Sequence, residues 1–305
     1  MVNTPKTNDR EAKKRDDESS VRLIERQEHA LTGASTNTSS DLTGEELVIG
    51  YPSADEPVIE RETITTKPGA VTALIGPNGS GKSTLLKGLA NQLAPEAGSV
   101  LIDGKDIHSL GGKDLARRLG LLSQESTAPD SLTVEDLVMH GRYPHRGFFE
   151  SVTDADHRAV ERAIELAGCD HLREREVGSL SGGQKQLAWI AMVLAQETDV
   201  LLLDEPTTFL DLHHQLEVME IVETLRDESE ITVIVVLHDI EQAARHADYM
   251  VALRDGEIQA RGPPEEVVTE ELLAEVFGIE AEVEPTGRGP RITPVRAIHE
   301  GSDER

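Results

Sequence analysis

The sequence predicts an α/β fold built on a parallel sheet, and three stretches carry this prediction. Val200–Leu203 and Ile231–Leu237 are apolar without alternation, which is typical of parallel strands buried on both faces. Val71–Ile75, also apolar, leads into a glycine-rich loop, and an amphipathic helix over Ser83–Leu93 follows. A chain of 305 residues allows one large α/β unit with an appendage.

Shorter patterns predict the remaining elements. Within residues 98–124 we expect short strands, the last of them over Leu119–Ser123. Residues 133–195 are expected to be mainly helical. Asp255-Gly256 is typical of a hairpin turn. The other expected elements are strands over Leu47–Tyr51 and Val58–Thr65, a hairpin over Tyr249–Arg261, a helix over Leu272–Phe277 and two short strands within Glu280–Ala297.

The composition divides the chain into three parts. Residues 1–40 are polar and mixed in charge, so we expect a disordered extension in which only Val21–Ala30 is compatible with a short helix. Residues 41–278 form the main domain, with a helical subdomain over about 125–195. Residues 279–305 form a short C-terminal extension.

The net charge is strongly negative and unevenly distributed. The chain has 57 acidic and 30 basic residues, a formal charge of −27, whereas its first forty residues have seven of each. Such an acidic domain argues against a nucleic-acid partner. Because concentrated salt screens self-repulsion, we expect a halophilic source. An acidic surface for a basic partner is the alternative, but the acids are spread along the chain.

Three further classes are excluded by composition. No apolar run approaches the ~18–20 residues that cross a bilayer, and no secretory signal follows the N-terminus. Cys169 is the single cysteine, which excludes an internal disulfide framework.

The glycine-rich loop matches the phosphate-binding pattern G-x-x-x-x-G-K-[ST]. Its glycines let backbone N–H groups turn toward phosphate oxygens, and the following helix adds its positive end. Lys82 would reach the β- and γ-phosphates, and Ser83 would bind Mg²⁺. The predicted ATP-binding residues here are Gly76, Pro77, Asn78, Gly79, Ser80, Gly81, Lys82, Ser83 and Thr84.

Two carboxylates end the apolar strand at Leu203. Ionised groups resist burial, and a bound cation would explain Asp204 and Glu205 at this position. Asp204 would hold Mg²⁺, and Glu205 would act as the general base on the attacking water.

These residues, with five more motifs, resemble those of an ABC-type ATPase over roughly residues 45–278. The order of the elements agrees with the family throughout. The matching positions are Tyr51 (adenine stacking), Gln124 (Q-loop), Leu180-Ser181-Gly182-Gly183-Gln184 (signature), Leu210-Asp211 (D-loop) and His238 (switch histidine).

The resemblance implies a P-loop NTPase fold with a RecA-like core, an antiparallel β subdomain and an α-helical subdomain. It implies a head-to-tail homodimer in which Ser181 and Gly183 of one copy cap the γ-phosphate held by Lys82 of the other. Gln124 would lie near Mg²⁺ and His238 would contact the γ-phosphate. Gly182, Gln184 and Asp211 belong to the same composite site.

Longer stretches resemble the ATPase subunits of importers for iron–siderophore complexes, with haem and vitamin B12 importers as alternatives. These stretches are Gly141–His145, Ala188–Gln196, Pro206–Gln215 and Pro285–Pro290. The group implies a membrane permease, an extracytoplasmic substrate-binding protein and a place on the cytoplasmic face of the membrane. The chain departs from the family at Lys185 and Leu187, where arginine is common, and in its Thr-Phe-Leu before Asp211.

Two other function classes share parts of this pattern. A soluble ABC ATPase acting on ribosomes or DNA usually has two cassettes or a coiled-coil insertion, and this chain has neither. A small-molecule kinase would share the phosphate loop but has no use for Leu180–Gln184.

Overall fold

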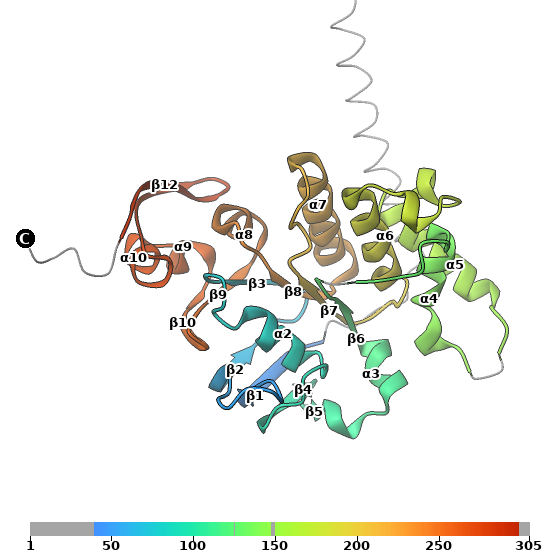
Figure 1. Ribbon diagram of the computed structural model, residues 1–305, viewed down its shortest axis with the longest axis horizontal. Helices are drawn as coiled ribbons and strands as arrows, with labels where there is room; N and C mark the ends of the chain where they lie inside the picture. Colours follow the sequence, from blue (N-terminus) through green and yellow to red (C-terminus); the bar gives the residue numbers. More distant parts are fainter. Residues whose placement is uncertain (1–39, 125, 148–149, 299–305) are drawn as a thin grey trace, which may run out of the picture.

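The central sheet of the computed structural model has six strands in the order β10-β9-β3-β8-β7-β6 (Figure 1). Strands β9, β3, β8, β7 and β6 are parallel, and β10 is antiparallel to β9. The structure describes residues 40–124, 126–147 and 150–298. The strands are β3 (Val71–Ile75), β6 (Leu119–Leu122), β7 (Val200–Asp204), β8 (Thr232–Val236), β9 (Tyr249–Arg254) and β10 (Glu257–Gly262).

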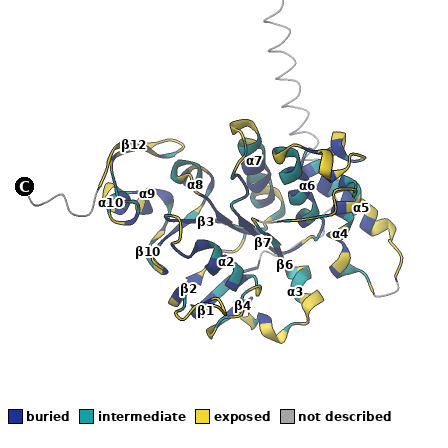
Figure 2. Cartoon of the chain, viewed as in Figure 1, coloured by how far each residue is buried: buried dark blue, intermediate teal, exposed yellow. Residues whose placement is uncertain are grey.

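Both faces of this sheet are covered, which explains its unbroken apolar strands. Every residue of β3, β7 and β8 is buried (Figure 2). Ala73 and Ile75 pack in the larger core with the helices, whereas Leu74 packs in a second core on the other face. The prediction of a parallel sheet buried on two sides is confirmed.

The second core lies between the central sheet and an antiparallel sheet of order β2-β1-β4-β5. Helix α2 (Lys82–Leu89) contributes Leu85, Leu86 and Leu89 to it. This helix is shorter than predicted, because Ala90 ends it, but Leu93 still packs against the same core. The strands are β1 (Leu42–Ile49), β2 (Ile59–Thr65), β4 (Ala97–Ile102) and β5 (Lys105–Asp106).

The helical part predicted over residues 133–195 contains three α-helices, which lie at one end of the molecule in Figure 1. Each begins with a reciprocal capping box, built on Thr133, Thr153 or Ser181. Short 3₁₀ turns at Tyr143–His145, Asp170–Leu172 and Val177–Ser179 connect them. The helices are α4 (Val134–His140), α5 (Asp154–Leu166) and α6 (Gly182–Leu194).

The C-terminal hairpin β11 (Ile279–Thr286) and β12 (Gly289–Ala297) lies at the opposite end and packs against α8 (Ile240–His246). The predicted turn between β9 and β10 is confirmed, since Asp255 and Gly256 both have positive φ (52° and 84°). The remaining helices are α7 (Leu212–Ser229), α9 (Pro264–Val267) and α10 (Glu270–Phe277).

The structure differs from the sequence-based expectation within residues 98–124. Helix α3 (Gly112–Arg118) and a 3₁₀ turn over Ile107–Ser109 lie between the strands there. None of the residues of α3 is buried, so the sequence of this segment lacks the apolar stripe that would have predicted a helix. Residues 1–39, with the possible helix over Val21–Ala30, lie outside the described residues. Ser40, counted in the extension, is buried.

Candidate active site

Four predicted motifs meet at the carboxyl edge of the central sheet. The strands β3, β8, β7 and β6 are consecutive neighbours, and their last residues, Ile75, Val236, Asp204 and Leu122, lie within about one residue of the same level. The loops that follow carry the glycine-rich stretch, His238, Glu205 and Gln124. Parallel strand order therefore brings together residues up to 162 positions apart (238 − 76).

The glycine-rich loop has a backbone that only glycine adopts readily. Gly79 and Gly81 have φ of 81° and 99°. A Cβ at Gly76 would lie 2.2 Å from the Leu253 carbonyl oxygen, whereas one at Gly79 would meet nothing within 4 Å. The loop is thus tightly packed at its base and open at its tip. No side chain caps α2 and no acid lies in its first turn, so its positive end is available to an anion.

Lys82 is enclosed by this loop. It is 4% exposed, and its Nζ donates to the carbonyl oxygens of Gly76 and Pro77 at 2.8 Å each. Burial lowers the pKa of Lys82, although the carboxylates of Glu205 and Asp204 oppose this shift. A desolvated cation beside open backbone N–H groups favours a phosphate ligand.

Ser83 and Asp204 offer oxygen atoms of the kind that bind Mg²⁺. The Ser83 hydroxyl donates to Asp204 Oδ1 at 2.8 Å. Asp204 is 2% exposed, and burial raises its pKa despite the hydrogen bond from Ser83. A divalent cation would stabilise the ionised carboxylate that burial disfavours, so the residues present fit Mg²⁺.

Glu205 has three side-chain partners. Its Oε2 accepts from Gln124 Nε2 at 2.7 Å and from the Thr208 hydroxyl at 3.2 Å, and its Oε1 lies 2.6 Å from His238 Nε2. Glu205 itself has a left-handed backbone, with φ of 52°. Gln124, Glu205 and His238 were each predicted as site residues from the sequence. In the structure, the side chains of Gln124 and His238 both contact the carboxylate of Glu205. Thr208 was missed, although it belongs to the polar run after Glu205.

Tyr51 lies beside the helix that leaves the glycine-rich loop. Its hydroxyl is 3.2 Å from the Thr84 hydroxyl, and 38% of the residue is exposed. One end of the side chain is therefore anchored, while the ring keeps a solvent-accessible surface that a base can cover.

The signature lies apart from the phosphate loop. Ser181 caps α6, where its hydroxyl accepts from Gln184 N at 3.3 Å. A Cβ at Gly183 would lie 2.7 Å from the His214 ring, and His214 Nδ1 is 2.9 Å from Asp211 Oδ1. The signature and the D-loop are therefore neighbours. Within the part of the chain that the structure describes, no hydrogen bond or ion pair joins residues 180–184 to residues 76–84.

Comparisons with known proteins point to one family. The model of the ABC transporter family matches residues 59–208. The ferric enterobactin transport ATP-binding protein FepC of Escherichia coli (strain K12) is 44% identical over 262 residues, which cover 85% of this chain and 96% of FepC. The iron(3+)-hydroxamate import ATP-binding protein FhuC of Bacillus subtilis (strain 168) is 44% identical over 244 residues, covering 80% of this chain and 90% of FhuC.

Solved structures share the fold over most of the chain. A metal-chelate type ABC transporter in an inward-facing conformation superposes with a TM-score of 0.72 at 27% identity, covering 85% of this chain and 98% of that one. A dimeric bacterial ABC transporter cassette gives a TM-score of 0.65 at 26% identity, covering 73% and 98%. The predicted ABC ATPase fold is confirmed. The chain belongs to the ABC transporter family, as an ATP-binding and ATP-hydrolysing subunit.

Proposed function

We propose that this chain hydrolyses Mg-ATP to energise import of an iron(III)–siderophore complex or related metal chelate through a separate membrane permease. The observation that carries the ATPase part is the convergence of Lys82, Asp204, Glu205 and His238 at one sheet edge. The proposal that the cargo is an iron(III)–siderophore complex is supported by the similar relatives, which are named for transport of ferric enterobactin and iron(3+)-hydroxamate.

ATP is held at the carboxyl edge by the chain's own groups. The backbone of Gly76–Gly81 and the N-terminus of α2 face the phosphates, and Lys82 exchanges carbonyl partners for phosphate oxygens. Thr84 holds the Tyr51 hydroxyl, which leaves the Tyr51 ring to stack on adenine. The remaining loop residues Pro77, Asn78 and Ser80 shape the same cradle.

Ser83, Asp204 and Gln124 are the proposed Mg²⁺ ligands, directly or through water. When bound, the ion offsets the negative charge of the phosphates. The support is the 2.8 Å Ser83–Asp204 hydrogen bond and the burial of Asp204 beneath it.

Glu205 is the proposed general base, which takes a proton from the attacking water. Its carboxylate is oriented by Gln124, Thr208 and His238, and a base held by fixed partners is positioned before the substrate arrives. His238 would then donate to the γ-phosphate.

A second copy completes the site. Because the signature and the phosphate loop of one chain lie apart, we assign the cap over the γ-phosphate to Ser181, Gly182, Gly183 and Gln184 of the partner subunit, with Asp211 beside them. Solved cassettes of this family that are dimeric support a homodimer.

The transporter would also contain a permease and an extracytoplasmic substrate-binding protein, and the chain would lie on the cytoplasmic face of the membrane. No helix in the described ranges is long and apolar enough to cross a bilayer. A vitamin B12 importer, a haem importer and an ABC ATPase without a permease are the alternatives.

Reconstitution with a permease from the same genome tests the proposal. Proteoliposomes with the binding protein should take up labelled ferric siderophore only with internal ATP, and Glu205→Gln should abolish uptake while retaining nucleotide binding. Glu282→Gln, an exposed acid on β11, is the matched control and should transport normally. Uptake of cobalamin or haem, without uptake of ferric siderophore, would contradict the proposed cargo. ATP hydrolysis without any uptake would overturn the transport role.

A further inference from the structure

A cavity of about 630 Å³ lies at the opposite edge of the central sheet from the nucleotide site. Its walls are α5, the end of α6, the end of α7 and the residues that lead into β7 and β8. It therefore spans the helical part and the core. Its apolar surface comes from Ala159, Ala163, Val193, Leu225 and Ile231, among others.

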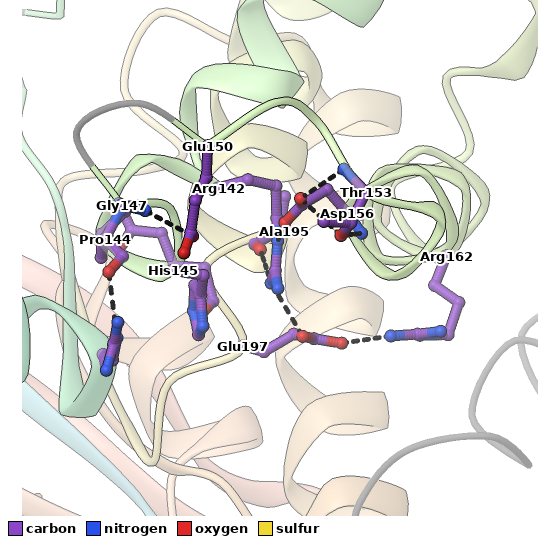
Figure 3. Close-up of polar contacts among 12 residues, drawn as sticks. Arg142, Pro144, His145, Gly147, Glu150, Thr153, Asp156, Arg162, Ala195 and Glu197 are labelled. Carbon is purple, nitrogen blue, oxygen red and sulfur yellow. Dashed lines mark hydrogen bonds and ion pairs between the residues drawn. The ribbon is translucent and has the colours of Figure 1, made fainter.

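Two polar side chains at its rim, Glu197 and His145, already have partners (Figure 3). Glu197 accepts from Arg142 and from Arg162 through its two carboxylate oxygens. His145 Nε2 lies 2.6 Å from the Gln196 carbonyl oxygen. A polar small molecule would compete with these contacts, whereas apolar side chains would bury the walls and leave the contacts intact.

The described chain begins beside this cavity. The Ser40 carbonyl oxygen accepts from the Thr232 hydroxyl at 2.6 Å, and Thr232 follows Ile231 of the cavity wall. Arg118 donates to both Ser40 Oγ and Asp199 Oδ2, and Asp199 follows the wall residue Thr198. The described part of the chain therefore begins at the cavity's edge.

The preceding segment matches the cavity in chemistry and reach. Val21, Leu23, Ile24 and Leu31 supply most of the large apolar side chains of residues 1–39. Residues 32–39 span up to roughly 26–29 Å when extended, enough to place residues 21–31 over the cavity. The first forty residues are neutral, whereas the rest of the chain carries the whole −27 charge, so repulsion does not expel the segment.

We propose that residues 21–31 dock in this cavity of their own chain, with their aliphatic side chains against α5, α6 and α7. The segment would tie α5 of the helical part to α7 of the core at a distance from the ATP site. The proposal does not depend on the transported cargo.

Cysteine cross-linking in the full chain tests the docking. Cys169 is buried, and burial raises the pKa of its thiol to about 12, so maleimides should spare it. With Gln27→Cys on the segment, Asp227→Cys at the cavity rim should form an intramolecular cross-link with a short bismaleimide. Arg288→Cys, on the β11–β12 turn that packs against α8 and takes no part in lining the cavity, is the matched control and should not.

A second pair of variants separates docking from chance proximity. Leu23→Ser with Ile24→Ser should lower the Asp227 cross-linking yield by at least about tenfold, because the loss of one buried aliphatic side chain is already worth roughly that factor. Thr36→Ala with Thr38→Ala, in the connecting residues, should leave the yield unchanged. Equal yields at Asp227→Cys and Arg288→Cys, insensitivity to the serines, or cross-links only between two chains would overturn the proposal.

Discussion

Arg142 joins three segments of the helical part from a buried position. Its side chain is 6% exposed; its Nε donates to Asp156 Oδ1 at 3.1 Å, and its Nη1 donates to the Ala195 carbonyl and to Glu197 Oε2 at 2.7 Å each (Figure 3). Asp156 lies in the first turn of α5, and Ala195 ends α6. Arg142→Met keeps much of the side-chain volume but removes every one of these bonds.

The expected loss in free energy of unfolding is about 3 kcal/mol. Removing one partner of a buried ion pair typically costs about 3–5 kcal/mol, because the other charge stays buried. We use the lower end of this range, because in Arg142→Met the carboxylate of Asp156 keeps its hydrogen bonds from Thr153 N and Oγ1 at 3.0 and 2.7 Å. Glu197 likewise keeps Arg162.

Urea unfolding in a fixed salt concentration measures this loss. Arg296→Met is the matched control, because its partner is Glu280 and the two side chains are 73% and 48% exposed. An exposed pair is worth about 1 kcal/mol or less. The reasoning is refuted if Arg142→Met costs no more than Arg296→Met.

The same variant changes the response to acid. Burial opposes ionisation of Asp156, but hydrogen bonds from Thr153 and Arg142 outweigh it and hold its pKa below the ordinary 3.8. A depressed folded-state pKa adds stability that is present above the unfolded value and is lost as the pH falls through the folded value. Stability should therefore fall below about pH 4 in the wild type and fall less steeply in Arg142→Met. Parallel acid profiles would contradict this.

Three further predictions concern the nucleotide site and the charge. Tyr51→Ala should weaken ATP binding by about 0.5–1.5 kcal/mol in titration calorimetry, whereas Tyr51→Phe, which keeps the ring but loses the Thr84 contact, should bind nearly normally. Ser181→Ala should lower ATP turnover while isolated monomers still bind ATP. Thr269→Ala, which removes the corresponding cap of α10, should leave turnover unchanged. Lowering the salt from molar to millimolar should lower the melting temperature, since the −27 charge then loses its screening; an unchanged temperature would count against a halophilic source.

Local patterns were sufficient for the elements that form the sheet edge. Val71–Ile75 matches β3 residue for residue, and Val200–Leu203 differs from β7 only in omitting Asp204. The run of buried aliphatic residues and the turn chemistry at each end carry that information. Helix α3 was missed because none of its residues is buried, so periodicity carried no signal.

Contacts between distant polar residues could not be predicted in the same way. Arg142 and Asp156 each look like ordinary surface residues in the sequence, and only the packing of α5 against α6 makes them a buried pair, with the exposed Glu197 at its edge. Phe209 illustrates the reverse. An aromatic beside the D-loop suggests a core residue, yet it is 96% exposed with φ of 63°.

Both halves of the proposed composite site are already ordered within one copy. Glu205 has its three partners, Lys82 sits in its loop, and Ser181 caps α6 beside the His214–Asp211 contact, all before any second copy is considered. Association would then have to position two preformed surfaces without folding either, which keeps its entropic cost low. We therefore expect the dimer to depend mainly on ATP, because the nucleotide is the group that both halves contact.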